Sequence, residues 1–195
     1  QGMLFAGLGA YSLSLSNAAA KQKKEVYFIA FPADIRKLVK ELEGKSANLT
    51  VNMNLPYLAE EITSISKAVK AIIQSYKAAL EEKLPLLNWK LISKKMKNLP
   101  LDKIIKDFNE LDLKQDPYKG FSITDAGVLD DYLPNFDRAT VIGCSVSDLN
   151  SIVVSSHKNV ITLTFPYLSS EKEKDPRNDF YERFKKTIYE IDRLK

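Results

Sequence analysis

The spacing of hydrophobic residues changes several times along the 195-residue chain, and each spacing predicts a different element. Residues 2–20 carry no charge, and large apolar side chains recur there at helical intervals. The pattern predicts a helix with apolar surface on most sides, which needs neighbours on several faces. Residues 1–20 also hold Gln1, Asn17, three serines and three glycines. That is too polar for a membrane span, so we expect the helix to be buried within the protein.

Two strands are expected next. Residues 25–31 form a short, continuous apolar run, which is typical of a strand covered on both faces. Pro32 is expected to end this strand, and residues 34–42 to form a short helix. Residues 48–55 alternate between apolar and polar side chains, which predicts a second strand.

Residues 57–83 are expected to form the longest helix, because their large apolar side chains follow the spacing of one helical stripe. Lysines lie beside this stripe, which also fits a weak membrane association through a helix at a lipid surface. Packing of the stripe in the core is the favoured interpretation. Pro85 is expected to end the helix, and shorter helices are expected near 88–97 and 101–110.

The second part of the chain is richer in strand signals. Four strands are expected, at residues 121–124, 139–147, 151–155 and 159–167. A turn at 156–159 joins the last two, and an amphipathic helix over 179–194 closes the chain. The sequence therefore predicts an α/β (α+β) fold, a mixed sheet flanked by helices, with residues 1–195 as a single domain.

Composition excludes several classes of function. The net charge is +4 and is spread along the chain, without the interleaved aromatic residues of a nucleic-acid platform. We therefore expect no nucleic-acid partner. The single cysteine, Cys144, excludes an internal disulfide and favours a reducing compartment, so we expect a cytoplasmic protein. Cys144 lies in an apolar run, where burial keeps a thiol inert, and we interpret it as structural.

The chain contains one histidine, His157, so any histidine-dependent catalysis has to use it. It lies in the expected turn at 156–159 with no carboxylate nearby to orient the ring, and we interpret it as an exposed turn residue. One cysteine and one histidine cannot supply the usual zinc ligands, so no metal site is expected. No phosphate-binding glycine loop is present either. The sequence thus indicates no catalytic residue.

Three segments of the chain carry motifs of a known family. Residues 25–36 end in Pro32-Ala33-Asp34-Ile35-Arg36 and resemble the strand ending in Pro-x-Asp-(Leu/Ile)-Arg of alcohol acetyltransferases, condensation domains and wax-ester synthase-like proteins. Residues 121–127 end in Thr124-Asp125-Ala126-Gly127, which is similar to the Thr-Asn-x-Gly or Ser-Asn-x-Gly strand end of the same proteins. Residues 148–167, followed by the last helix, look like their closing hairpin. Together the three segments resemble the chloramphenicol acetyltransferase-like superfamily.

The resemblance implies a two-lobed, CoA-dependent acyltransferase of which this chain is the C-terminal lobe. In that family a His-x-x-x-Asp motif in the N-terminal half supplies the general base, and CoA enters a tunnel between the halves. Here Ile161 stands where the Asp would follow His157. The departure implies that the chain, alone, cannot transfer an acyl group.

The resemblance also assigns expected roles to five residues. Asp34 and Arg36 match the Asp-x-Arg pair, for which we expect a structural role with Arg36 bidentate to a carboxylate. Thr124, Asp125 and Gly127 match the strand end that faces the substrate and CoA tunnel. Asp125 replaces the usual Asn, and an ionised Asp cannot donate a hydrogen bond, so an oxyanion-type role is in doubt.

Two classes of function follow. In the first, the chain is part of an acyltransferase that moves an acyl group, expected to be acetyl, onto an alcohol or amine. Acyl-CoA is then a co-substrate, no cofactor is tightly bound, and the partner is the N-terminal half or a second copy. In the second, it is a non-catalytic binding or structural module that keeps the half-fold. As an enzyme part it should expose an apolar patch, expected to include Phe5, Leu8 and Tyr11 of the first helix and residues 124–129.

Overall fold

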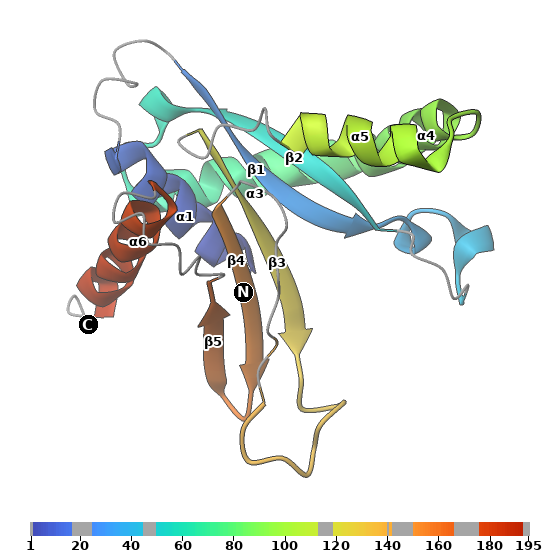
Figure 1. Ribbon diagram of the computed structural model, residues 1–195. Coiled ribbons are helices and arrows are strands. Elements are labelled where there is room, and N and C mark those ends of the chain that lie inside the picture. The colour runs from blue at the N-terminus through green and yellow to red at the C-terminus, as the bar shows by residue number, and fades with distance from the viewer. Residues whose placement is uncertain are drawn as a thin grey trace.

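A five-stranded mixed sheet flanked by helices forms the protein, as the sequence predicts (Figure 1). The computed structural model describes residues 2–16, 25–44, 50–112, 119–139, 141, 150–165 and 176–192. The strands are β1 (Val26–Asp34), β2 (Thr50–Leu58), β3 (Gly120–Val128), β4 (Asn150–His157) and β5 (Val160–Thr164), in the order β2-β1-β3-β4-β5. The α-helices are α1 (Gly2–Ser16), α3 (Ile65–Glu81), α4 (Leu84–Met96), α5 (Leu101–Asp112) and α6 (Pro176–Asp192).

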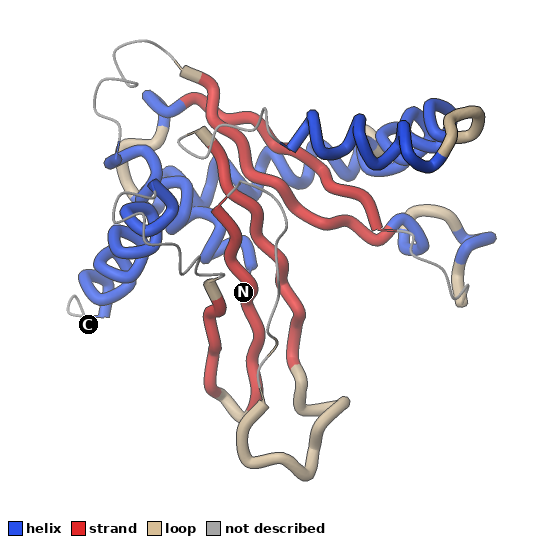
Figure 2. The backbone as a smooth tube through the Cα atoms, in the orientation of Figure 1, coloured by secondary structure: helices blue, strands red, loops and turns tan. Residues whose placement is uncertain are grey.

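The sheet opens into a fork between β1 and β3. These two parallel strands pair only from Phe28 opposite Gly120 to Ala30 opposite Ser122. Beyond that point β1 stays paired with β2, and β3 stays paired with β4. Figure 2 shows the two pairs running in different directions after they separate. The carboxyl ends of β1 and β3 therefore enclose a space between them.

Proline does not end β1, contrary to the expectation from sequence. The strand continues through Pro32 to Asp34, and Pro32 lies opposite Asn52 of β2. Pro32 is tolerated because β3 has already diverged, so that, among the described strands, β1 has a neighbour on one side only at this position. Residues 34–42, expected to form one helix, form two short 3₁₀ turns, η1 (Ile35–Lys37) and η2 (Lys40–Leu42).

Helix α1 lies at the centre of the helical layer and packs against α3, α6 and β3. Most of its described residues are buried within the protein, as expected, although Leu4 and Leu15 are exposed. Two of its serines are buried but satisfied: the Ser12 hydroxyl lies 2.8 Å from the Leu8 carbonyl and 3.0 Å from the Thr187 hydroxyl of α6. The expectation that Phe5 and Leu8 form an exposed patch is wrong, because both side chains are buried in this layer.

A glycine sets the distance between α1 and α3. A Cβ atom at Gly7 would lie 2.4 Å from Cγ2 of Val69 and 2.7 Å from its Cα. Side chains cannot approach this closely, so only glycine lets the two helices meet here. This contact places the N-terminus of α1 beneath the fork.

The long helix is shorter than expected at its start. Residues 57 and 58 still belong to β2, and a 3₁₀ turn, η3 (Ala59–Glu61), precedes α3. The Ser64 hydroxyl caps α3 by accepting a hydrogen bond from the Lys67 amide. Ala68 and Ile72 are buried, which confirms that the apolar stripe of this helix faces the core. Pro85 lies in the first turn of α4, a position that proline tolerates.

The last elements close the core with aromatic rings. Phe121 of β3 lies 5.4 Å from the ring of Phe180 of α6, and Tyr181 accepts a hydrogen bond from the Ser151 amide of β4. The β4–β5 hairpin turns at Lys158 and Asn159, both with positive φ. The strand expected at 139–147 and Cys144 lie outside the described residues, apart from residues 139 and 141, which are not in a strand.

Candidate functional site

The fork between β1 and β3 holds a cavity of about 740 Å³. Its lining comes from the ends of both strands, the start of α1, part of α3, the start of β2 and the turn after β1. The lining residues are Gly2, Met3, Phe31, Pro32, Ala33, Asp34, Leu38, Thr50, Tyr76, Leu80, Ile123, Thr124 and Asp125. The cavity combines apolar walls with a few polar groups, which is typical of small-molecule sites. The structure thus brings Asp34 together with Thr124 and Asp125.

Asp125 joins the cavity wall to the start of α1. Its Oδ2 atom accepts a hydrogen bond of 2.8 Å from the Gly2 amide, and its Oδ1 atom accepts one of 2.9 Å from the Gly127 amide. A carboxylate at a helix N-terminus satisfies an amide that the helix cannot pair and complements the helix dipole. Asp125 therefore acts here as an acceptor, a role that needs no side-chain donor.

Gly127 serves the backbone rather than the cavity. Its φ of +77° lies in the left-handed region, at the irregularity where the β3–β4 register shifts. Glycine adopts this conformation without strain. Gly127 does not line the cavity in the structure.

Asp34 and Arg36 pair with each other at the end of β1. The Arg36 Nε atom donates to both carboxylate oxygens of Asp34, at 2.8 and 3.0 Å, and Nη2 lies 2.7 Å from Oδ2. Asp34 also accepts from the Arg36 amide and so caps η1. The hydrogen bond that the Arg36 guanidinium donates to Asp34, and then the negative charge of Asp34, raise the pKa of that guanidinium. The pair fixes the turn that carries Leu38 to the cavity wall.

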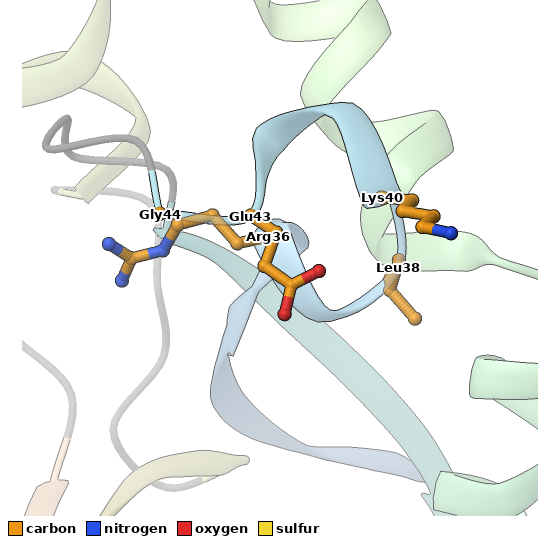
Figure 3. A pocket seen from close by; sticks show the side chains of 5 residues that line it. All are labelled: Arg36, Leu38, Lys40, Glu43 and Gly44. Carbon is orange, nitrogen blue, oxygen red and sulfur yellow. The ribbon is translucent and has the colours of Figure 1, made fainter.

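A second, open pocket of about 600 Å³ adjoins the cavity and shares Leu38 with it. Arg36, Lys40, Glu43 and Gly44 complete its lining. Figure 3 shows the Arg36 guanidinium and the Lys40 ammonium on opposite sides of the turn. The two cations do not converge, so the described part of this pocket does not assemble a phosphate site.

The only histidine lies elsewhere and is not exposed, which corrects the expectation from sequence. His157 is the last residue of β4 and is only 3% exposed. Its Nε2–H donates to the Phe136 carbonyl at 2.9 Å, because a carbonyl can only accept. His157 lines a different pocket, of about 510 Å³, with residues 137–139, Val160 and Thr162. Residues 129–139 fold back over the strand end and bury the ring.

The fork cavity therefore lacks a general base of the histidine type. Its two carboxylates, Asp34 and Asp125, are engaged by protein donors. Among the residues that the structure describes, no three His, Cys, Asp or Glu side chains gather to hold a metal ion. The arrangement is a partly open cavity with apolar walls, whose two carboxylates are already hydrogen-bonded to the protein.

Sequence reasoning missed several lining residues. Gly2, Met3, Tyr76 and Leu80 reach the cavity from helices that the apolar pattern could only assign to the core. Phe31 contacts Tyr76 edge to face, with ring centroids 5.5 Å apart, and this pair closes one wall. Phe31 precedes Pro32-Ala33-Asp34 directly, so the motif could have identified it as a lining residue. Nothing in the sequence linked Tyr76 to Thr124.

Comparisons with known proteins give a likeness in structure alone. No family model matches the sequence, and no curated protein matches it. The structure of polyketide synthase associated protein 5 from Mycobacterium tuberculosis is similar, with a TM-score of 0.52 and 14% identity, over 92% of this chain and 43% of that one. Vinorine synthase gives a TM-score of 0.39 at 11% identity, over 77% of this chain and 33% of that one.

The likeness to the mycobacterial protein is one of fold alone, and it agrees with the mixed sheet flanked by helices that the sequence predicts. This chain spans less than half the length of either solved structure. No helix in the described part of the chain is both long and apolar enough to cross a membrane.

Proposed function

We propose that the chain forms the C-terminal lobe of a CoA-dependent acyltransferase, which moves an acyl group from acyl-CoA onto an alcohol or amine. The carrying observation is the fork cavity, where the strand ends of both family-like motifs meet. Thr124 and Asp125 line one wall and Asp34 the other, as a shared substrate channel requires. Acetyl is the acyl group that the resemblance to alcohol acetyltransferases favours.

In this proposal the chain forms the walls of the substrate channel, and the N-terminal lobe provides the general base. The cavity holds no histidine, and His157 is buried in another pocket. A general base must lie within hydrogen-bond reach of the proton that it removes. The N-terminal lobe, with its His-x-x-x-Asp motif, would bring that base to the cavity. Apolar side chains such as Phe31 and Ile123 would hold the acyl chain and exclude water.

A non-catalytic module is the second candidate. It is favoured by the engaged state of both cavity carboxylates, which fits a structural role for each motif. In that case the cavity either binds a ligand or is only the space left between the diverging strands, and no second lobe is needed.

The first experiment examines the encoding gene and the purified chain. An upstream His-x-x-x-Asp in the same reading frame supports the acyltransferase proposal. A natural polypeptide that starts near Gln1 favours the non-catalytic module. The purified chain should release no thiol from acetyl-CoA in the presence of alcohols or amines. Turnover that disappears in His157→Ala would contradict the assignment of the base to another lobe.

The second experiment tests the cavity in the complete gene product. Thr124→Val keeps the side-chain volume and removes the hydroxyl, so kcat/KM for acyl transfer should fall. Thr63→Val, an exposed position away from the cavity, is the matched control. Equal kinetics for the two variants would remove Thr124 from the proposed channel.

A further inference from the structure

Helix α4 presents a solvent-exposed face on which leucines and lysines are interleaved. Leu87 is 48% exposed and Leu91, one turn later, is 67% exposed. Lys90, Lys94 and Lys95 are exposed and lie three or four residues from one of these leucines. Residues at this spacing are neighbours on a helix surface. The leucines and lysines therefore form one continuous surface, called here the α4 face.

The α4 face is not needed to attach the helix to the fold. The helix packs against β2, α3 and η1, and Pro85 is buried at its start. In Figure 1, α4 and α5 lie at the opposite end of the molecule from α6. The face is thus presented at one extremity, where a large flat partner can reach it.

Positive charge is concentrated in the segment that contains α4, whereas the sequence of the next helix, α5, holds four acidic residues and two lysines. Residues 83–101 contain five lysines and no aspartate or glutamate. The net charge of the whole chain is only +4, so this segment alone carries more positive charge than the molecule. Lys95 lies 3.7 Å from Asp107 of α5, but its side chain stays largely exposed. The field around the α4 face favours an anionic partner.

Exposed leucines among the lysines distinguish between anionic partners. Nucleic acids are bound through phosphate contacts and stacking side chains, and exposed leucines make neither of these contacts. The cores of protein interfaces are depleted of lysine, which this face contains at every turn. An anionic lipid surface accepts both kinds of side chain, because leucines enter the acyl boundary while lysines remain among the headgroup phosphates.

We infer that the α4 face docks on an anionic lipid membrane surface. The helix lies parallel to the surface, with Leu87 and Leu91 inserted and Lys90, Lys94 and Lys95 on phosphate groups. Leu101 of α5, which is also exposed, extends the apolar contact beyond the following turn. This contact is peripheral, and it is independent of the function proposed for the cavity.

Vesicle flotation of the purified chain tests this inference. The probes are vesicles of phosphatidylcholine alone and of phosphatidylcholine mixed with phosphatidylserine. The chain should float with the mixed vesicles and much less with phosphatidylcholine alone. Lys90→Glu with Lys94→Glu should weaken binding by about tenfold or more, because each lysine near an anionic surface contributes separately. Leu87→Ser with Leu91→Ser should also abolish flotation.

Matched variants on other helices distinguish binding through the α4 face from general effects of charge and hydrophobicity. Lys185→Glu with Lys186→Glu makes the same charge change on exposed positions of α6. Leu4→Ser with Leu15→Ser replaces two exposed leucines of α1. Both controls should float like the original chain, and circular dichroism should show all variants folded.

Three outcomes would overturn the inference. The first is equal flotation of the α4 and control variants. The second is equal binding to both kinds of vesicle, which would remove the anionic recognition. The third is concentration-dependent self-association, measured by light scattering without lipid, that disappears in Leu87→Ser with Leu91→Ser, since the face would then belong to a second copy.

Discussion

The backbone amide of Gly2 donates a hydrogen bond to Oδ2 of Asp125, over 2.8 Å and across 123 residues of sequence. This bond ties the first turn of α1 to the end of β3, beside the fork cavity. It also explains why an aspartate is suited to a position where the resembled family usually has an asparagine. A carboxylate accepts from two amides at once and complements the positive end of the helix.

Replacement of Asp125 should therefore destabilise the fold. Asp125→Ala leaves the Gly2 and Gly127 amides without this acceptor, and the free energy of unfolding should fall by about 1–2 kcal/mol. Asp125→Asn keeps one acceptor oxygen but loses the second acceptor and the charge, so its loss should be below that of alanine, at about 1 kcal/mol. Urea unfolding followed by circular dichroism measures both. Asp131→Ala, at an exposed position, is the control, and an Asp125→Ala variant as stable as that control would refute the capping role.

A methyl group at Gly7 should disrupt the contact between α1 and α3. Alanine normally favours a helix over glycine, but here its Cβ would meet Val69 at 2.4–2.8 Å. The overpacking should lower the free energy of unfolding by about 1–3 kcal/mol. Val69→Ala should rescue Gly7→Ala only in part, because Cα and N of residue 69 remain too close. Full rescue in a double-mutant cycle would place the clash in the side chain alone.

Removal of the His157 hydrogen bond should loosen residues 129–139. His157→Phe preserves most of the buried volume and removes the hydrogen bond to the Phe136 carbonyl, at a cost of about 0.5–1.5 kcal/mol because Phe136 is exposed to water. Amide hydrogen exchange should increase for Leu129 and Leu133, whose amides donate within this region and to Ser156. His157→Gln, which can still donate, should show less exchange than His157→Phe. Unchanged exchange in both variants would show that the hydrogen bond does not hold the segment.

Stability should fall in alkaline solution partly through Tyr57. Burial, and then the charge of nearby Tyr27, raise the pKa of Tyr57 well above its usual value. The unfolded chain has a tyrosine pKa of about 10, so the contribution of the neutral phenol is complete below that pH and is lost as pH rises above it. Tyr57→Phe should flatten this alkaline loss, measured as melting temperature against pH. Tyr132→Phe, an exposed change, should leave the alkaline slope as it was.

The Tyr57 hydroxyl is also buried, and it has no hydrogen-bond partner among the residues that the structure describes. Its removal should therefore cost little at neutral pH and can stabilise the fold, since a buried unsatisfied hydroxyl is unfavourable. A large loss of stability at neutral pH in Tyr57→Phe would indicate that the hydroxyl has a partner.

Local pattern determined much of the fold. The apolar run of β1, the stripe of α3 and the uncharged first helix were each predicted from the spacing of hydrophobic residues, because burial on one or more faces imposes that spacing. The mixed sheet flanked by helices followed from the order of these elements. The family resemblance also placed Asp34, Thr124 and Asp125 at strand ends, although it could not show that these residues line one cavity.

Tertiary structure decided the rest. Pro32 was expected to end β1, but the divergence of β3 leaves that position with one neighbour among the strands that the structure describes, and proline is tolerated there. His157 was expected to be exposed, but residues 129–139 cover it through contacts distant in sequence. The fork cavity depends on where parallel pairing stops and on the approach of α1 at Gly7. Such pairings join residues far apart along the chain, and local periodicity carries no information about them.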